Sequence, residues 1–234
     1  MKKLIISGLL AGMLVMSQSA TAQSVDDIVT KYIDALGGKE KLMSLKTLKM
    51  EGNMNVQGAD LTITSTKSNM AGFRLDIEVM GTSNYQIVNS TKGTAFWPIR
   101  GMSTPEDMSA DQFKSYFNQL DIQGPLVNYK EKGIQVEFSG TEKTGGSDTY
   151  KLKITYKNGV VANYFIDTKT NRLVKTTSKV SGNGQEMEVE TSYSDYRQNA
   201  DGYWFAYAMT TSQGTVNYDK ITTNMPVAES LFKF

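Results

Sequence analysis

The chain has 234 residues, contains neither cysteine nor histidine, and carries a formal net charge of +1. Without cysteine there are no disulfides and no thiolate ligands or nucleophiles, and without histidine there is no imidazole to act as a base or to bind zinc. A charge so close to zero provides no overall field that would attract nucleic acid or an anionic membrane surface, so we expect no nucleic-acid partner.

The first 22 residues have the pattern of a secretory signal peptide. Lys2 and Lys3 precede a short apolar run, Leu4–Met16, and Ala20-Thr21-Ala22 forms a small-x-small cleavage site. The apolar run is too short to span a bilayer, which makes an uncleaved N-terminal anchor the less favoured alternative. We therefore expect cleavage after Ala22, export to the periplasm, and a mature chain of residues 23–234.

Two helices are predicted at the start of the mature chain. Apolar residues recur every three or four positions from Val25 to Leu36, which is typical of one face of a helix capped by Ser24. Gly37-Gly38 ends this helix, because glycine readily adopts the left-handed conformation found there. A second short helix is expected over Lys39–Leu45.

From Thr47 the apolar period changes from helical to two, which predicts strands. In Phe73–Val79 every second side chain is charged, as expected for a strand with one buried and one solvated face. The strands expected in this half of the chain are Leu48–Val56, Leu61–Thr64, Phe73–Val79 and Asn84–Val88.

The middle of the chain interrupts the strand pattern. Gly93–Gly101 is an apolar break, and Ser103-Thr104-Pro105 resembles a helix start with proline in the first turn. Helical spacing of aromatic residues predicts a helix over Asp111–Leu120, which Gly124-Pro125 ends. The pattern of Leu126–Lys132 fits either a short helix or a loop.

Strands joined by short turns resume after residue 133 and predict an antiparallel meander. Asn158-Gly159 favours a tight hairpin with positive φ at both central residues, and Gly182-Asn183-Gly184 and Asp201-Gly202 mark further turns. No linker separates the two runs of strands, so we expect one α+β domain with one large curved sheet rather than two domains. The expected strands are Ile134–Phe138, Thr149–Lys157, Val160–Asp167, Leu173–Val180, Glu186–Arg197, Tyr203–Thr211 and Thr215–Thr223.

No catalytic centre is indicated. Asp76 and Glu78 fit an acid/base pair or part of a calcium site, but period-two alternation favours a solvated strand face. Ser192 and Ser194 have no histidine partner, and no glycine-rich phosphate loop is present. We therefore expect no catalytic residue, no metal and no cofactor, and a protein that is not an enzyme.

A sheet of this size needs a cover that about three helices cannot complete. The sheet therefore either rolls up and fills itself or stays open around an apolar hollow, and we expect the hollow. The residues predicted to line this cavity are apolar and lie on the expected strands or beside them: Phe73, Leu75, Ile77, Val79, Tyr85, Ile87, Trp97, Tyr150, Leu152, Ile154, Tyr164 and Ile166.

Five stretches occur along nearly the whole mature chain: Tyr32–Lys41 (YIDALGGKEK), Gly124–Gly133 (GPLVNYKEKG), Tyr164–Leu173 (YFIDTKTNRL), Tyr193–Arg197 (YSDYR) followed by Asp201-Gly202, and Val227–Phe232 (VAESLF). In this combination and order they resemble the periplasmic lipoprotein-carrier superfamily (LolA/LolB/LppX-like), in the version common among Bacteroidota and called outer membrane lipoprotein-sorting proteins. The stretches are structural and contain no catalytic motif.

The resemblance implies a strongly curved antiparallel sheet, an incomplete and unclosed β-barrel, with helices that cover or plug its concave face. It also implies a periplasmic carrier or binding protein that holds lipoprotein acyl chains or other lipid without chemistry. The expected partners are lipid or lipidated protein cargo and an outer-membrane acceptor protein, and the expected state is a monomer. The alternatives are an envelope scaffold that binds proteins through the sheet edge or outer face and, less favoured, a hydrolase that uses carboxylates.

Overall fold

The computed structural model describes residues 24–234, apart from 183 and 184. The expected signal peptide with its cleavage after Ala22, and the centre of the expected turn at Gly182-Asn183-Gly184, lie outside the described residues. Within residues 24–182 and 185–234, no helix is both long and apolar enough to cross a membrane.

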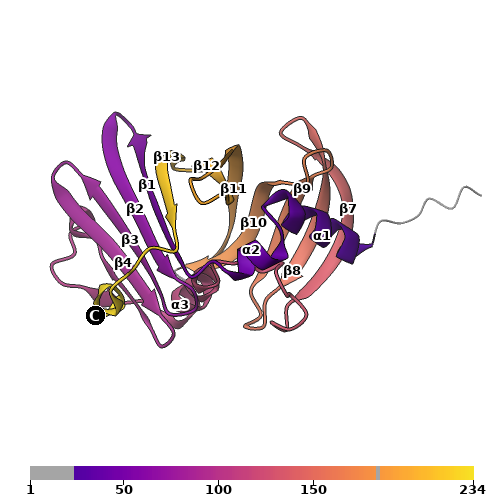
Figure 1. Ribbon diagram of the computed structural model, residues 1–234. Helices are drawn as coiled ribbons and strands as arrows, with labels where there is room; N and C mark the ends of the chain where they lie inside the picture. Colours follow the sequence, from indigo (N-terminus) through magenta and orange to yellow (C-terminus); the bar gives the residue numbers. More distant parts are fainter. Residues whose placement is uncertain (1–23, 183–184) are drawn as a thin grey trace, which may run out of the picture.

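Thirteen strands form one antiparallel sheet, as the sequence predicts (Figure 1). The order across the sheet is β6-β5-β4-β3-β2-β1-β13-β12-β11-β10-β9-β8-β7, so that β6 and β7 lie at opposite edges and the sheet stays open. The strands are β1 (Thr47–Val56), β2 (Ala59–Ser68), β3 (Gly72–Val79), β4 (Thr82–Asn89), β5 (Gly93–Phe96), β6 (Glu106–Asp107), β7 (Gln135–Thr144), β8 (Ser147–Thr155), β9 (Val161–Asp167), β10 (Leu173–Gly182), β11 (Gln185–Gln198), β12 (Trp204–Thr211) and β13 (Gly214–Thr223).

The helices are few and short. The α-helices of the described residues are α1 (Val25–Ala35), α2 (Lys39–Met43) and α3 (Ala110–Phe117), and the 3-10 turns are η1 (Pro98–Arg100), η2 (Asn118–Leu120) and η3 (Glu229–Phe232). The expected cap of α1 is confirmed, because the Ser24 side chain accepts a hydrogen bond from the Asp27 amide at 3.1 Å. In Figure 1, α2 and α3 lie between the β1–β4 half of the sheet and the β7–β10 half.

Two local predictions from the sequence are wrong. The helix does not start at Ser103-Thr104-Pro105: α3 starts after Ser109, which exchanges hydrogen bonds with Gln112 in a capping box (3.3 and 2.9 Å). In the Asn158-Gly159 turn only Gly159 has positive φ, since the Asn158 side chain accepts from the Val160 amide and closes the turn instead. The undecided segment Leu126–Lys132 forms turns rather than a helix.

The strands that come first and last in the chain, β1 and β13, are neighbours in the sheet and pair through a β-bulge. Strand β1 pairs with β13, and the register shifts between Glu51 and Gly52. A Cβ atom on Gly52 would lie 2.2 Å from the Asn217 carbonyl oxygen, so this close approach of two backbones requires glycine. The β1–β13 pairing joins the two halves of the chain into one surface.

Cross-strand neighbours trace one continuous face of the sheet. Because side chains directly opposite each other project to the same side, this face can be followed from strand to strand. From β3 to β8 the trace runs through Phe73, Lys67 and Leu48, then Met54, Val216, Met209 and Tyr193, and then Thr191, Thr176, Tyr164 and Leu152. We call it the inner face, because the three α-helices pack on it.

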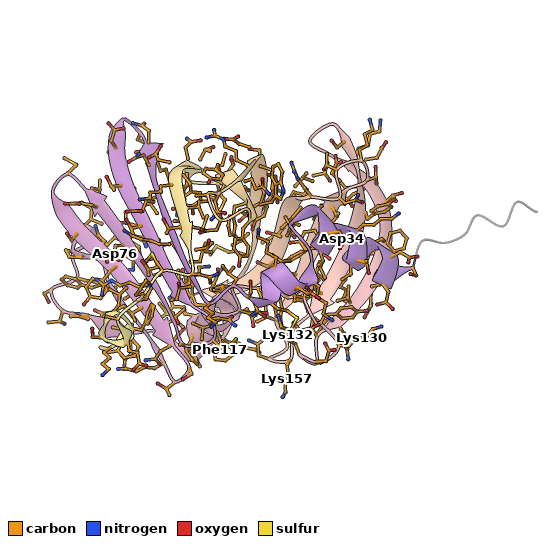
Figure 2. All side chains as sticks on the ribbon, in the orientation of Figure 1. Asp34, Asp76, Phe117, Lys130, Lys132 and Lys157 are labelled. Carbon is orange, nitrogen blue, oxygen red and sulfur yellow. The ribbon has the colours of Figure 1, made fainter. Side chains whose placement is uncertain are left out.

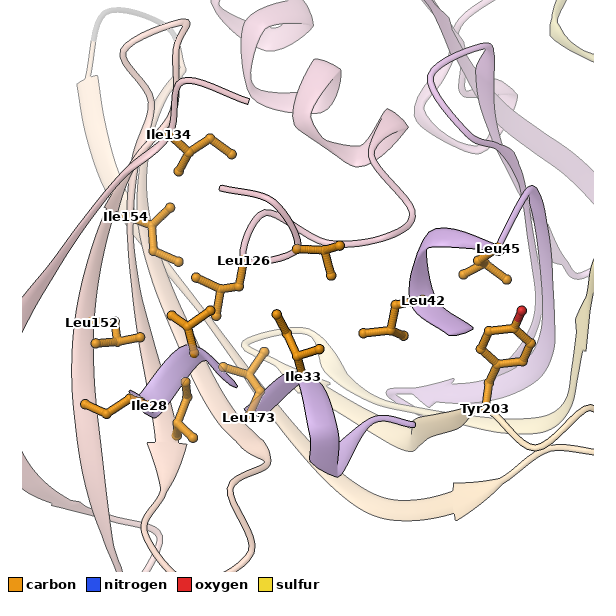
Figure 3. Close-up of a cluster of buried hydrophobic side chains, with 13 residues drawn as sticks. Ile28, Ile33, Leu42, Leu45, Leu126, Ile134, Leu152, Ile154, Leu173 and Tyr203 are labelled. Carbon is orange, nitrogen blue, oxygen red and sulfur yellow. The ribbon is translucent and has the colours of Figure 1, made fainter. Parts of the chain in front are cut away.

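Two apolar clusters on the inner face are covered by helices. Under α1 and α2, Ile28 and Ile33 pack among buried residues of β8 and β9 and of the 121–134 segment (Figure 3). Under α3, Phe73 and Val88 pack with Leu120 and the half-buried aromatic residues of α3. These clusters lie toward opposite ends of the sheet, and α3 contacts both β4 and β10, so it reaches between the two halves.

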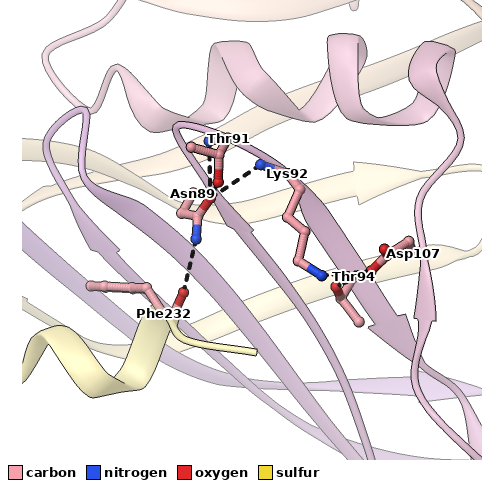
Figure 4. Close-up of polar contacts among 6 residues, drawn as sticks. All are labelled: Asn89, Thr91, Lys92, Thr94, Asp107 and Phe232. Atoms are coloured by element: carbon pink, nitrogen blue, oxygen red, sulfur yellow. Dashed lines mark hydrogen bonds and ion pairs between the residues drawn. The ribbon is translucent and has the colours of Figure 1, made fainter.

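The chain terminus covers part of the opposite, outer face. The Asn89 side chain donates a hydrogen bond to the Phe232 carbonyl oxygen at 3.3 Å (Figure 4). The Phe232 ring occupies the space above Gly72, where a Cβ atom would lie 2.2 Å from it. The closing segment with η3 is therefore held against β3 and β4 on the side away from α3.

Candidate binding site on the inner face

The middle of the inner face carries an apolar cluster without a helical member, which we call the central cluster. Its buried residues come from β1, β12 and β13, and its half-buried residues come from these strands and from the segment after η2. The members are Leu48, Tyr207, Tyr218 and Ile221, with Met50, Ile122, Phe205, Met209 and Val216 packed against them. Phe205 and Ile122 also contact the cluster under α1, so the apolar surface continues between the two.

Half-buried residues in and next to the central cluster lie side by side. Met209 on β12 is the cross-strand neighbour of Val216 on β13 and of Tyr193 on β11. All three are half-buried, as is Met50 on β1. Methionine side chains are flexible and polarisable and adapt to differently shaped apolar partners. This part of the sheet therefore presents an adaptable apolar surface that the described residues leave partly open.

Several tyrosines of the central cluster and of the cluster under α1 lie in a poorly solvated environment. Burial raises the pKa of the Tyr156 phenol to about 12 and that of Tyr218 to about 12. Burial likewise raises the pKa of Tyr164 and of Tyr193 above the usual value. The hydroxyl groups of Tyr156 and Tyr164 lie 3.3 Å apart and share a hydrogen bond. The aromatic faces thus provide apolar area while their hydroxyl groups are satisfied within the protein.

The residues predicted from β3 lie on the inner face. Phe73 is buried in the cluster under α3, and Leu75 packs against it. Val79 is buried and Ile77 is half-buried, and alternation along β3 places both on the same side as Phe73. Leu75 and Ile77 are therefore half-buried on the inner face, whereas Phe73 is part of the packed core beneath α3.

Other predicted residues from this half of the chain lie elsewhere. Tyr85 and Ile87 on β4 are cross-strand neighbours of Asp76 and Arg74, which places them on the outer face. The Arg74 guanidinium stacks on the Tyr85 ring at 4.9 Å from its centroid. Trp97 precedes η1 and stacks with Arg100 at 5.2 Å. The positions of Tyr85 and Ile87 on a strand could be predicted from the sequence. Their placement on the face opposite Phe73 depends on the β3–β4 register.

The predicted residues of β8 and β9 lie together on the inner face. Leu152, Ile154 and Ile166 have no exposed surface and form the base of the cluster under α1 (Figure 3). Tyr150 and Tyr164 pack against the same cluster and stay half-buried. The first three residues are enclosed in this packed core, whereas the two tyrosines lie at its half-buried margin.

The central cluster itself was missed by the sequence prediction. Its signal is nonetheless present, because Phe205, Tyr207 and Met209 alternate along one expected strand and Val216 and Tyr218 along the next. What the pattern lacked was the pairing of β13 with β1, which brings Leu48 and Met50 to these residues.

The acidic pair considered from the sequence has a structural role. Asp76 forms an ion pair with Arg74 at 2.8 Å, on the β1–β4 half of the sheet (Figure 2). A hollow of about 100 Å³ beside it is lined by Thr62, Thr64, Asp76, Ile77, Glu78, Ser83 and Asn84. In the part of the chain that the structure describes, no three acidic, histidine or cysteine side chains gather closely enough to hold a metal ion.

The architecture defines a class of protein, the open antiparallel half-barrels with helices on the inner face. The chain matches no protein-family model, and it matches no curated protein sequence. Solved structures show the similarity. An outer membrane lipoprotein-sorting protein domain from Vibrio parahaemolyticus superposes with a TM-score of 0.55 at 15% identity, covering 88% of this chain and 95% of that one.

Two further structures agree. A LolA superfamily protein from Nitrosomonas europaea has a TM-score of 0.55 at 11% identity and covers 88% of this chain and 96% of that one. A DUF1329 family protein from Desulfovibrio piger has a TM-score of 0.54 at 13% identity, with 88% and 97% covered. This chain therefore has the fold of LolA superfamily proteins, as the sequence resemblance implies.

Proposed function

We propose that this protein is a periplasmic carrier or binding protein for acyl chains, either of lipoproteins or of other lipids, and that it works without chemistry. The observation that carries the proposal is the central cluster, an apolar inner surface that no helix of the described residues joins. The LolA-like fold supports it, since two of the similar structures are a lipoprotein-sorting domain and a LolA superfamily protein. No feature of the structure favours the scaffold alternative.

The energetics suit a carrier that must release its cargo. Each buried methylene contributes about 0.8 kcal/mol, so about ten would contribute 8 kcal/mol before the costs of ordering are subtracted. The remaining affinity is micromolar or weaker, which permits transfer to an acceptor. We propose that Leu75, Ile77, Tyr150 and Tyr164, from the residues predicted by sequence, form the walls of the site around the central cluster.

The wider setting belongs to the same proposal. The chain is exported to the periplasm after loss of residues 1–22, and residues 23–234 act as one domain. It is a monomer that accepts lipid or lipidated protein and passes it to an outer-membrane acceptor. The direct test is organic extraction of the protein purified from its native envelope, followed by mass spectrometry. Stoichiometric lipid supports the proposal. A lipid-free protein that also binds no acyl-chain probe contradicts it.

Substitution of Met209 by lysine tests the place of the cargo. Met209→Lys puts a charge on the half-buried apolar surface between Tyr193 and Val216, and burying that charge under an acyl chain is costly. We expect the affinity for a fluorescent fatty acid, measured by titration, to fall about tenfold or more, which corresponds to 1.4 kcal/mol or more.

The matched control is Met80→Lys. Met80 lies in the β3–β4 turn and is 84% exposed, so the same chemical change there leaves affinity unchanged. Equal binding by Met209→Lys, Met80→Lys and the unchanged protein would place the cargo away from the central cluster.

A further inference from the structure

Lys67 lies on the inner face among apolar neighbours. On β2 it is directly opposite Leu48 of β1 and Phe73 of β3. Its Nζ atom lies 5.0 Å from the centroid of the Phe73 ring. Leu48 belongs to the central cluster and Phe73 to the cluster under α3, so the ammonium group stands at the junction of the two.

The charge of Lys67 is not neutralised by a carboxylate among the described residues. Its Nζ atom donates instead to the neutral Gln119 side chain, with 2.9 Å to Oε1. Lys49, Lys132 and Lys175 are also partly buried, and each has an acidic partner within 3.5 Å. Burial lowers the pKa of Lys67 to about 8. A cation that is partly withdrawn from water without an opposite charge is a ready site for an anion.

We propose that Lys67 binds the anionic head group of an amphiphile whose acyl chain lies on the central cluster, an inference that rests on the proposed carrier function. The head group is a carboxylate or a phosphate, and the Gln119 side chain also carries an Nε2 group that can donate a second hydrogen bond to it. Met209 on β12 lies three strand spacings from Lys67, about 14 Å across β1 and β13, and six residues further along, from Leu48 to Met54, which is about 20 Å, so the path between the two residues is about 24 Å. The cargo class is thus an acidic lipid rather than a neutral one.

The test compares palmitic acid with its methyl ester, which has the same chain without the charge. Binding is measured by calorimetry near neutral pH to the unchanged protein and to Lys67→Met, Lys67→Arg and Lys31→Met. Lys31 is exposed on α1 and controls for the loss of one positive charge. We expect the unchanged protein and Lys31→Met to bind the acid about tenfold or more tightly than the ester, as for a hydrogen bond to a charged group.

The two variants at Lys67 separate charge from shape. Lys67→Met is expected to bind the acid as weakly as the ester and to leave ester binding unchanged, which also shows that its fold is intact. Lys67→Arg is expected to retain a preference for the acid. Equal affinity for acid and ester in the unchanged protein, or a preference that survives in Lys67→Met, overturns the proposal while leaving the carrier function in place.

Two more probes distinguish the head group of a lipid from a free anion. Monopalmitoyl lysophosphatidic acid is expected to bind in a manner that depends on Lys67, whereas inorganic phosphate alone is expected to bind negligibly, because it has no chain for the central cluster. Phosphate binding that depends on Lys67, without binding of palmitic acid, marks a free-anion site and overturns the proposal. Failure of acid, ester and lysophosphatidic acid alike contradicts the carrier function itself.

Discussion

At the scale of single residues, the inner face is largely apolar but includes a few polar side chains. Among these, Lys67 has a pKa that burial lowers to about 8. Leu61 and Ile63 lie on the same face of β2 as Lys67, at alternate positions nearer the start of the strand. A hydrophobic residue in place of Lys67 would continue the core between Leu48 and Phe73. The protein instead keeps an amine at this point, which lowers stability locally and is available to a ligand.

The free energy of unfolding should depend on pH because of the Lys67 amine. The pKa of Lys67 is about 8 in the folded state against 10.5 for an unperturbed lysine. Below 8 both states are protonated and the folded state bears the full cost of the partly buried charge. Between 8 and 10.5 the unfolded chain holds more protons, so the free energy of unfolding rises with pH across this window.

Lys67→Met removes that dependence. We expect the variant to exceed the unchanged protein by about 1–2 kcal/mol near neutral pH, after allowance for partial exposure, and the difference to shrink as pH rises through 8 toward 10.5. Urea unfolding at a series of pH values measures it, with Lys31→Met as the control. A difference that stays constant across the window would contradict a lowered pKa.

At the scale of elements, α3 is a short helix whose start depends on a capping box. It has only eight residues, and its first turn is secured by the reciprocal Ser109–Gln112 hydrogen bonds. Its aromatic residues close one flank of the inner face by packing on Phe73 and Leu120. The stability of α3 therefore decides how well that flank is covered.

Removal of the cap should loosen α3 alone. Ser109→Ala is expected to lower the free energy of unfolding by about 1 kcal/mol, as for other N-cap serines. Amide hydrogen exchange in residues 110–117 should accelerate, while exchange in β8 and β9 stays unchanged. Ser115→Ala is the control, because Ser115 lies inside α3 and its hydroxyl bonds the Asp111 carbonyl oxygen, an interaction that does not favour the helix. Equal effects of the two substitutions would argue against the capping box.

Long alternating strands could be predicted from the sequence because each has one solvated face, and Phe73–Val79 is the plainest example. The two short strands at one end of the sheet could not be predicted: Gly93–Phe96 and Glu106–Asp107 carry too few alternations to show a period. The misplaced start of α3 has a similar cause, since Pro105 resembles a first-turn proline while the decisive signal, serine followed three residues later by glutamine, stands at Ser109.

At the scale of the whole molecule, the open curved sheet was predictable but the composition of the site was not. The candidate lining chosen from single strands mixes several locations: the core under α1, the core under α3, half-buried positions elsewhere on the inner face, and the outer face. The central cluster depends on the pairing of β1 with β13, between residues far apart in the chain, and on the bulge at Gly52. No local pattern contains that information.

Binding at the central cluster should stabilise the whole fold. A ligand that binds only the folded state adds about 2.7 kcal/mol at a hundred times its Kd. For a domain of this size, about 2–4 °C in Tm accompanies each kcal/mol, so we expect palmitic acid to raise Tm by roughly 5–10 °C. Differential scanning calorimetry measures the shift, which Met80→Lys should retain and Met209→Lys should lose. An unchanged Tm at saturating palmitic acid would contradict binding to the folded state.

The unpaired edges of the sheet bear on which guests the proposed carrier would accept. A closed barrel has a diameter set by its strand number and stagger, so its lumen admits a fixed girth. Here β6 has two residues and β7 is interrupted by a bulge near Gly140, and the two edges do not meet. Small changes in the twist between neighbouring strands, summed over thirteen strands, can change the curvature of the inner face without breaking a hydrogen bond between strands. In the proposed carrier, the size of a guest then excludes few candidates. Selectivity among guests depends instead on the guest's polar head group.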